Sequence, residues 1–405
     1  MKRVMSSLAL ALSLCLLNPL AQAATVHYWY HFDNADNTMT DLIARFEKQN
    51  PDIRIAAENI PWNSYYDNLY TALVGGSAPD AAMVKTFALP RLQQMEVLEP
   101  LDDYINQWDG KNNLLENTVK IARGGMDKHY FLPVQYIVSY LYYRTDYFQK
   151  AGLTPPKTCD DFYADMKKLT QDTNGDGKTD IYGFGFRGGV GGQDMWAPLI
   201  MPYGGEFKAG GLTKPAVLQA SQRIVDAWKA RLFPPSATTD GFKDVIGAFK
   251  AGKTAMTIHH IGSANDLNAV LGDNVSAVPL PVCNGKRWAP IAVESNAIFT
   301  TAADKAATWK WIAFLSSAEN NAQFNRATGQ LPVTKSDTQA WHGHPKRFLD
   351  ATVNSLPDAE DYPNTPQLSD FVNTVWPVNM QQALLGQISV EQMNSKIETL
   401  FSAQP

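Results

Sequence analysis

Alternation between strand-like and helix-like segments near the start of the chain restricts the fold more than any other feature of the sequence. Thr25–Tyr30, Asp52–Glu58 and Asp80–Val84 are mostly apolar, β-branched or aromatic, which predicts strands. Thr38–Gln49 and Ser64–Val74 carry apolar residues at helical spacing, and turn-forming proline or glycine ends each of them. Such alternation predicts the α/β class, with mostly parallel sheets covered by helices.

A long extended segment separates this unit from a second one. Lys128–Tyr143 is extended and aromatic, but Pro133 would be awkward inside a central strand, so we expect the segment to cross between two lobes. A second α/β unit is predicted over residues 146–258, and Val275–Pro281 is another extended segment marked by prolines. The length of 405 residues agrees with two or three folding units.

The first residues read as a secretory signal. A short basic head precedes the apolar run Val4–Leu17, and a small-x-small site ends at Ala23. The run is too short to span a membrane, and no later stretch approaches the ~18 apolar residues that a span needs. Leu14 stands where a lipid-attachment box before Cys15 would need a small residue. We therefore expect cleavage after Ala23, no lipid anchor and a periplasmic protein.

Composition excludes some partners. The formal net charge is −5, and no Lys/Arg block occurs beyond the signal, which argues against nucleic-acid binding and against attraction to anionic membranes. The 45% of apolar residues supports large buried cores, and the ten tryptophans make pockets lined by aromatic rings plausible.

Several stretches, in this order along the chain, resemble the extracytoplasmic solute-binding proteins of ABC importers, in the sugar-binding family that includes maltose-binding protein. They are LIARFEKQNPDI (42–53), GSAPD (76–80), KHYFLPVQYIVSYLYYRTDYF (128–148), MWAPLIMPYGGEFK (195–208), FKAGKTAMTI (249–258), VSAVPLP (275–281) and YPNTPQLSDF (362–371). The resemblance covers essentially residues 24–401. It implies a non-enzymatic, monomeric receptor that closes over one carbohydrate and presents it to the permease subunits of an importer.

The same resemblance implies the domain layout. Two α/β lobes joined by a multi-strand hinge are expected: lobe I over residues 24–132 and 282–331, and lobe II over residues 133–281 and 332–405. Cys159 would then lie in lobe II and Cys283 just inside lobe I. Because a bridge between lobes would oppose closure, we predict that these two cysteines remain unpaired.

Ligands of open parallel α/β sheets bind at the carboxyl ends of strands. Applied to the first three strands, this rule nominates His31, Asp33, Trp62, Tyr65 and Lys85, although plain surface exposure is an alternative for Asp33 and Lys85. Rings to stack on sugar faces and polar groups for hydroxyls are the two kinds of side chain that a sugar site needs.

The resemblance nominates further residues around the cleft. Some belong to the hinge, others to the loop after strand 254–258, to a helix near Trp196, to the segment 294–296 and to the C-terminal helix. A core position is the alternative for Trp196, and an imidazole that only bonds to polar neighbours is the alternative for His259 and His260. These candidates are Gln135, Tyr136, Trp196, His259, His260, Gly262, Glu294, Ser295, Asn296 and Trp376.

The chain departs from maltose-binding protein at its specificity positions. Val84, Gly262 and Val372 stand where that protein has stacking tryptophans, and Ile137 stands where it has a hinge carboxylate. A mono- or oligosaccharide other than a long maltodextrin, or a polyol, is therefore the expected ligand.

One loop has the spacing of a calcium site. Asp172, Asn174, Asp176 and Asp180 occupy positions 1, 3, 5 and 9 of such a loop, with glycine at position 6. Gly183 stands at position 12, where a bidentate glutamate normally completes the shell. The alternative is a tight turn rich in Asp and Asn. Any bound calcium would be structural, and no other cofactor is expected.

Enzymatic alternatives have weaker support. Gly183-x-Gly185-x-x-Gly188 is spaced like a dinucleotide fingerprint, but exported proteins rarely meet nicotinamide cofactors. A secreted carbohydrate-active enzyme would need two carboxylates flanking a glycosidic bond, and no local motif nominates such a pair. A receptor for ferric iron is an alternative within the binding proteins. Tyr142 and Tyr143 cannot both face one ferric ion, because adjacent strand residues point to opposite faces.

Overall fold

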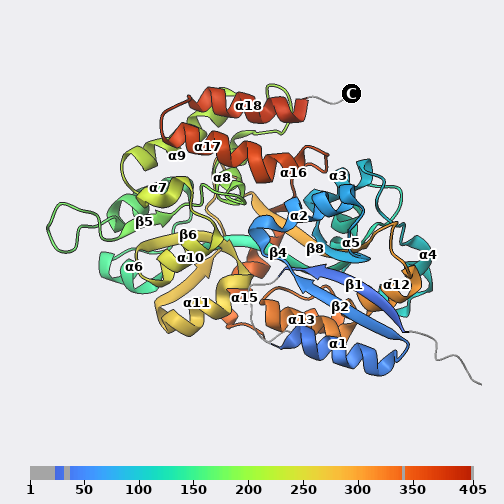
Figure 1. Cartoon of the computed structure of the whole chain (residues 1–405). Coiled ribbons are helices and arrows are strands. Elements are labelled where there is room, and N and C mark those ends of the chain that lie inside the picture. Colours follow the sequence, from blue (N-terminus) through green and yellow to red (C-terminus); the bar gives the residue numbers. More distant parts are fainter. Residues whose placement is uncertain (1–22, 32–36, 340–342, 403–405) are drawn as a thin grey trace, which may run out of the picture.

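The computed structural model describes residues 23–31, 37–339 and 343–402. The chain forms two α/β lobes that share a central pair of long strands (Figure 1). Within the described part, no helix is long and apolar enough to cross a membrane. The predicted signal peptide and Asp33 lie outside the described residues, apart from Ala23 at the end of the signal.

Three strands near the N-terminus start the sheet of the first lobe: β1 (Ala24–Tyr30), β2 (Ile53–Asn59) and β3 (Ala81–Lys85). β1 pairs in parallel with both of the others, as the alternation of strands and helices predicts. The helices that belong to this half are α1 (Thr38–Gln49), α2 (Trp62–Gly75), α3 (Leu89–Gln94), α4 (Asp102–Gln107), α5 (Glu116–Arg123), α12 (Lys305–Leu315), α13 (Ala318–Thr328) and α14 (Lys335–Gln339).

The hinge consists of two long antiparallel strands, β4 (Phe131–Arg144) and β8 (Ala289–Ile298). β8 pairs with β3 of the first lobe, and the second half of β4 pairs with β6 of the second lobe. β4 is apolar and aromatic along almost its whole length because both of its faces are covered. The sheet order is β2-β1-β3-β8-β4-β6-β5.

Pro133 sits within β4, where the pairing with β8 shifts register between Pro133 and Gln135. The carbonyl of Val134 accepts hydrogen bonds from the amides of Asn321 (2.7 Å) and Asn325 (3.0 Å) on α13. A proline is tolerated there because buried side-chain donors replace the interrupted ladder.

The second lobe contains the short strands β5 (Tyr182–Gly185), β6 (Thr254–His260) and β7 (Val275–Val278). β9 (Ala359–Glu360) pairs with β8. The remaining helices are α6 (Thr145–Ala151), α7 (Cys159–Leu169), α8 (Gln193–Ile200), α9 (Pro215–Lys229), α10 (Phe242–Lys250), α11 (Ala264–Leu271), α15 (Lys346–Ser355), α16 (Leu368–Asp370), α17 (Trp376–Leu384) and α18 (Val390–Ser402).

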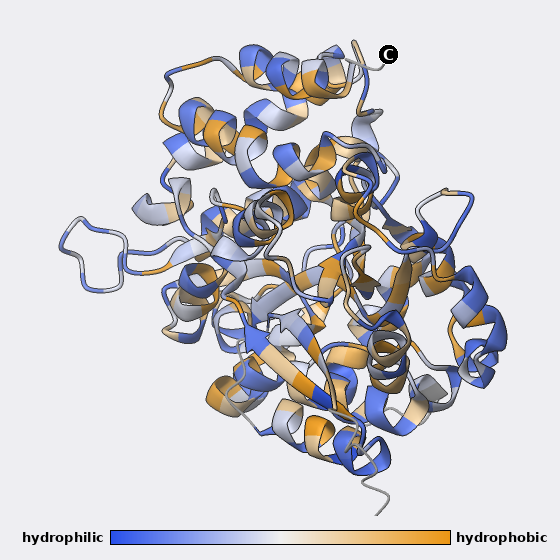
Figure 2. Cartoon of the chain, turned by 45° about the vertical axis from the view of Figure 1, so that its right-hand side comes forward, coloured by the Kyte–Doolittle hydropathy of each residue, from blue (hydrophilic) through white to orange (hydrophobic). Residues whose placement is uncertain are grey.

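The buried apolar side chains of the described residues form two hydrophobic cores. The first gathers around Tyr28, Phe46 and Trp311, and the second around Phe184 and Trp376. Hydrophobic residues mark the strands at the centre, while the outer helices such as α17 and α18 carry mixed faces (Figure 2). The first core is not confined to the first lobe, because it also includes Phe249, Leu267 and Val275 of the second.

The cysteines correct one prediction. Cys159 and Cys283 form a disulfide with their Cα atoms 5.0 Å apart, so the expectation of two unpaired thiols is wrong. Both residues belong to the second core, and Cys283 does not lie in lobe I as predicted. Since the bridge is internal to one lobe, it does not oppose movement of the lobes.

Candidate functional site

A cavity of about 580 Å³ lies between the lobes and over the hinge. Its wall includes side chains that follow β1 and β3 in the first lobe, side chains from both hinge strands, and side chains around β5, β6 and α10 in the second lobe. Gln135, Ile137 and Ser139 of β4 line it at every second position, as the alternation of a strand requires.

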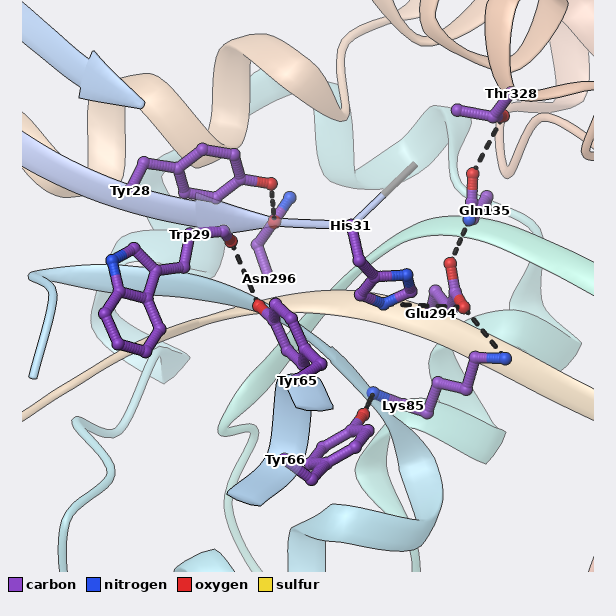
Figure 3. A network of polar contacts seen from close by, with 10 residues as sticks. All are labelled: Tyr28, Trp29, His31, Tyr65, Tyr66, Lys85, Gln135, Glu294, Asn296 and Thr328. Carbon is purple, nitrogen blue, oxygen red and sulfur yellow. Dashed lines mark hydrogen bonds and ion pairs between the residues drawn. The ribbon is translucent and has the colours of Figure 1, made fainter. Parts of the chain in front are cut away.

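Glu294 organises the polar groups on the first-lobe side (Figure 3). Its carboxylate lies 3.0 Å from the Lys85 ammonium and 3.8 Å from His31 Nε2, and it accepts a hydrogen bond from the Gln135 amide. Thr328 donates to the other end of that amide at 3.0 Å. Burial raises the pKa of Glu294, but the Lys85 and His31 charges outweigh it, so the pKa lies below its usual value and Glu294 is ionised.

Aromatic rings stand beside this network. Trp62 lines the cavity, its ring 4.9 Å from that of His31 and 4.3 Å beneath the Lys85 ammonium. Tyr65 packs behind His31 at 4.7 Å between ring centroids. An indole face next to charged hydrogen-bonding groups can contact both the apolar face and the hydroxyl groups of a sugar.

On the second-lobe side, two histidines and a phenylalanine form a stack. The ring of His259 lies 4.7 Å from Phe242 and 3.9 Å from His260. Burial is the main cause that lowers the pKa of His259, to about 3, and that of His260 well below its usual value. Gly262 N donates to His260 Nδ1 at 3.1 Å, so the proton of the neutral ring sits on Nε2.

Arg187 and Asp194 are two further charged residues on the second-lobe side of the cavity. Arg187 follows β5 and Asp194 lies in the first turn of α8; both line the cavity. Asp194 Oδ1 accepts hydrogen bonds from Tyr362 (2.9 Å) and Gln193 (3.2 Å). Burial raises the pKa of Asp194, with Tyr362 and Arg187 acting in the opposite direction.

Many predicted residues reach this wall. The residues on it are His31, Trp62, Lys85, Gln135, His259, His260, Gly262 and Glu294. Their contact with a ligand stays a prediction.

Four other predicted residues lie behind the wall. Tyr136 and Ser295 neighbour Gln135 and Glu294 on their strands and therefore face the opposite side. Tyr65 donates to the carbonyl of Trp29 (3.1 Å), and Asn296 accepts from Tyr28 (2.7 Å), both within the first core. The structure therefore gives Tyr65, Tyr136, Ser295 and Asn296 supporting positions and not the predicted contact positions.

Trp196 and Trp376, which were also predicted to contact the ligand, lie behind the cavity wall as well. Each is 0% exposed, and their rings lie 6.3 Å apart in the second core. α8 is buried along almost its whole length: Trp196 packs into the core, while Gln193 and Asp194 line the cavity. Two large indoles fill the core beneath the site and do not line it.

The predicted calcium loop, 172–180, is exposed and projects beside β5 (Figure 1). Asp172 accepts hydrogen bonds from the backbone of Gly175 and Gly177, and Asp180 accepts from Thr173, as in a turn closed by its own side chains. In the part of the chain that the structure describes, no group of three or more His, Cys, Asp or Glu is arranged to hold a metal. Calcium binding stays a prediction.

The sequence reasoning missed Arg187, Gln193, Asp194 and Phe242, all on the cavity wall. Arg187 lies two residues beyond the end of β5, so the strand-end rule that nominated Lys85 also applies to it. The sequence interpretation instead compared Gly183, Gly185 and Gly188, on either side of Arg187, with a dinucleotide fingerprint.

The lobes also touch along a rim outside the cavity. Arg91 on α3 forms an ion pair with Asp370 on α16 at 2.7 Å and lies over the Tyr70 ring at 4.3 Å. Tyr70 on α2 and Ser369 share a hydrogen bond of 3.0 Å. Contacts of this kind between the lobes are those of a closed cleft.

Comparison with known proteins agrees with this architecture. Residues 33–322 match the family model of the bacterial extracellular solute-binding proteins. A binding protein of Brucella abortus is 29% identical, with 84% of this chain and 83% of that protein covered. The sn-glycerol-3-phosphate-binding periplasmic protein of Escherichia coli is 25% identical, with 81% and 78% covered.

Solved structures share the fold. A solute-binding protein of an ABC transporter from Thermotoga lettingae, bound with α-D-tagatose, superimposes with a TM-score of 0.83 at 22% identity, covering 94% of this chain and 100% of that one. One from Agrobacterium vitis with bound D-mannitol gives 0.78 at 22% identity, covering 94% and 97%. With the match of the family model over most of its length, the chain belongs to the bacterial extracellular solute-binding proteins.

Proposed function

We propose that this protein captures an uncleaved carbohydrate, a mono- or oligosaccharide or a polyol, by closing its two lobes, and delivers it to the permease of an importer. The observation that carries the proposal is the cavity between the lobes, whose wall combines the Trp62 face with the polar groups around Glu294 and His260. Flat rings and charged hydrogen-bonding groups are the complement of a sugar's apolar faces and hydroxyls.

Relatives support this ligand class. The similar proteins of known structure hold tagatose and mannitol, a sugar and a polyol. The cavity of about 580 Å³ lies within the usual range for small-molecule sites. Closure around a guest is the physical mode that a two-strand hinge permits.

Export and partners follow from the same proposal. The secretory signal would be removed after Ala23, and the mature protein would act as a monomer in the periplasm. N-terminal sequencing of protein secreted by its host should begin at Ala24, and a retained leader would contradict this part.

Titration calorimetry against a panel of sugars and polyols tests the function. The proposal predicts one bound ligand per chain, which chromatography recovers unchanged. Appearance of cleavage products would instead favour a secreted carbohydrate-active enzyme. Absence of binding by every carbohydrate in the panel would contradict the proposal.

A further inference from the structure

Arg187 is a buried cation for which the described part of the chain provides no hydrogen-bond or ion-pair partner. The residue is 8% exposed and lines the cavity. Within the described residues its guanidinium makes no hydrogen bond or ion pair, and its covered Nε is unsatisfied. Burial lowers the pKa of Arg187 to about 10, so the group stays charged at neutral pH. An unpaired charge taken out of water is costly, so a partner is expected to enter from the cavity.

Arg144 shows how this fold treats a buried arginine that has a structural role. Arg144 is also 8% exposed, but it lies outside the cavity wall. Its Nε and Nη2 donate to Asp146 at 2.9 and 2.7 Å, and its guanidinium lies 4.3 Å from the Tyr147 ring. The two arginines are matched in burial and differ in partners, which makes Arg144 a control for Arg187.

The loop after β5 holds the guanidinium in place. Gly191 has φ +84°, and a Cβ there would lie 2.5 Å from Arg187 Nη2. At Gly192, a Cβ would collide with the Arg187 carbonyl and lie 2.8 Å from Trp376. The two glycines therefore let the backbone pack directly against Arg187, and its own N–H is bonded to Met195 Sδ at 3.2 Å.

Asp194 supplies the opposite charge on the same wall. No ion pair joins Asp194 to Arg187 in the described residues, although Asp194 is the charge that acts favourably on the Arg187 cation. Tyr362 and Gln193 both bond to Asp194 Oδ1. The wall thus offers free guanidinium donors and a separate anionic acceptor.

A hydroxyl group suits this arrangement because it can accept a hydrogen bond from one partner and donate to the other. A phosphate or carboxylate could bond to Arg187 but would be repelled by Asp194 and by the ionised Glu294 across the cavity. An ammonium group would be repelled by Arg187 and by Lys85.

We infer that Arg187 and Asp194 bind neighbouring hydroxyl groups of an uncharged sugar or polyol, and that this pair makes the protein reject phosphorylated and acidic forms of the same ligand. The inference rests on the proposed function. It adds that the ligand is uncharged and that Arg187 and Asp194 select for this property.

Binding of paired probes by the full mature chain tests the inference. The panel joins neutral sugars and polyols to charged counterparts: glucose with glucose 6-phosphate and glucuronate, mannitol with mannitol 1-phosphate, and glycerol with glycerol 3-phosphate. We expect the bound ligand to be neutral and its charged counterpart to bind at least ~100-fold more weakly, since a like-charge contact and an unmatched hydroxyl site both oppose it.

The variants separate recognition from folding. Arg187→Met should weaken binding of the neutral ligand ~100-fold, the loss of about two charge-assisted hydrogen bonds, while Tm stays equal or rises because an unpaired buried charge is removed. Arg144→Met should lower Tm and leave affinity within about twofold. Asp194→Asn should weaken neutral binding ~10-fold and reduce the discrimination against phosphate.

Three results would overturn the inference and leave solute binding intact: tighter binding of a charged counterpart by the wild type, wild-type affinity in Arg187→Met, or unchanged discrimination in Asp194→Asn. Should Arg187→Met fail to fold, Arg187→Lys replaces it, with an expected loss of at least ~10-fold because the forked geometry is gone. Binding of no carbohydrate at all would overturn the proposed function, and the inference with it.

Discussion

The side chains around the cavity are of two kinds. Some line the cavity, and others lie behind these and hold them in place. Lys85 and Glu294 face the cavity as an ion pair, while Tyr66 accepts the backbone N–H of Lys85 at 2.8 Å from behind. Trp62 and Trp196 illustrate the same division among the indoles, because the first is half-buried on the wall and the second is fully buried.

Substitution of Trp62 should therefore affect ligand binding, whereas substitution of Trp196 should affect stability. Trp62→Ala should weaken ligand binding ~10-fold or more with little change in unfolding free energy, since a stacking surface is lost. Trp196→Ala should cost about 3–5 kcal/mol of stability, as for a large ring removed from a core. Calorimetry and urea unfolding measure the two effects. Unfolding of Trp62→Ala, or loss of affinity without loss of stability in Trp196→Ala, would contradict the assignment.

The two stacked histidines predict a pH dependence of stability. The pKa of His259 in the native state is about 3, so below pH ~6.5 the unfolded chain binds a proton that the native chain does not. The contribution of His259 to stability is then complete above pH ~7 and declines as pH falls, by ~2 kcal/mol at pH 5. His260 adds to the same trend because its pKa is also depressed.

Urea unfolding at pH 7 and pH 5 checks this expectation. The His259→Asn/His260→Asn double variant keeps an acceptor near each Nδ1 and should show a smaller difference between the two pH values. Equal pH dependence in the wild type and the double variant would show that the rings are already charged in the native state.

At the scale of elements, the disulfide joins the start of α7 to the segment before β8, across a sequence separation of 124. A crosslink over a loop of this length restricts the unfolded chain strongly. The Cys159→Ala/Cys283→Ala variant should lose ~3–5 kcal/mol of unfolding free energy. Ligand affinity should not change, because neither cysteine lines the cavity. A fall in affinity as large as the fall in stability would argue against a purely structural bridge.

Elements were easier to predict than contacts. The strand–helix alternation of the first lobe is as predicted. α7 lies in the predicted second α/β unit, and Thr158 and Asp161 cap it reciprocally. Local pattern and capping residues carry this information. The cysteine bridge could not be predicted locally, because it depends on where two distant segments meet in the folded chain.

The same contrast between local pattern and long-range contact applies to the candidate site. Strand ends nominated His31 and Lys85 correctly as cavity residues, because that rule needs only the topology. Burial decided the failures: Trp376 packs under Gly192, a contact that no spacing in the sequence reveals. Arg187 was missed although its place after a strand was readable.

For the whole molecule, two kinds of contact connect the lobes. β4 and β8 run through the hinge (Figure 1). The rim contacts of Arg91 with Asp370 and of Tyr70 with Ser369 lie outside the cavity. The rim ion pair is partly exposed, and pairs of that kind contribute only ~0.2–1 kcal/mol. This ion pair alone is therefore too weak to hold the lobes together without a guest.

Small-angle X-ray scattering of the mature protein, with and without a saturating concentration of its sugar or polyol, tests the central claim that the lobes close over a guest. The account predicts a more open molecule without ligand and a smaller radius of gyration with it, approaching the value calculated for the structure described above. Identical scattering curves in the two states, at a concentration where calorimetry shows full occupancy, would contradict it.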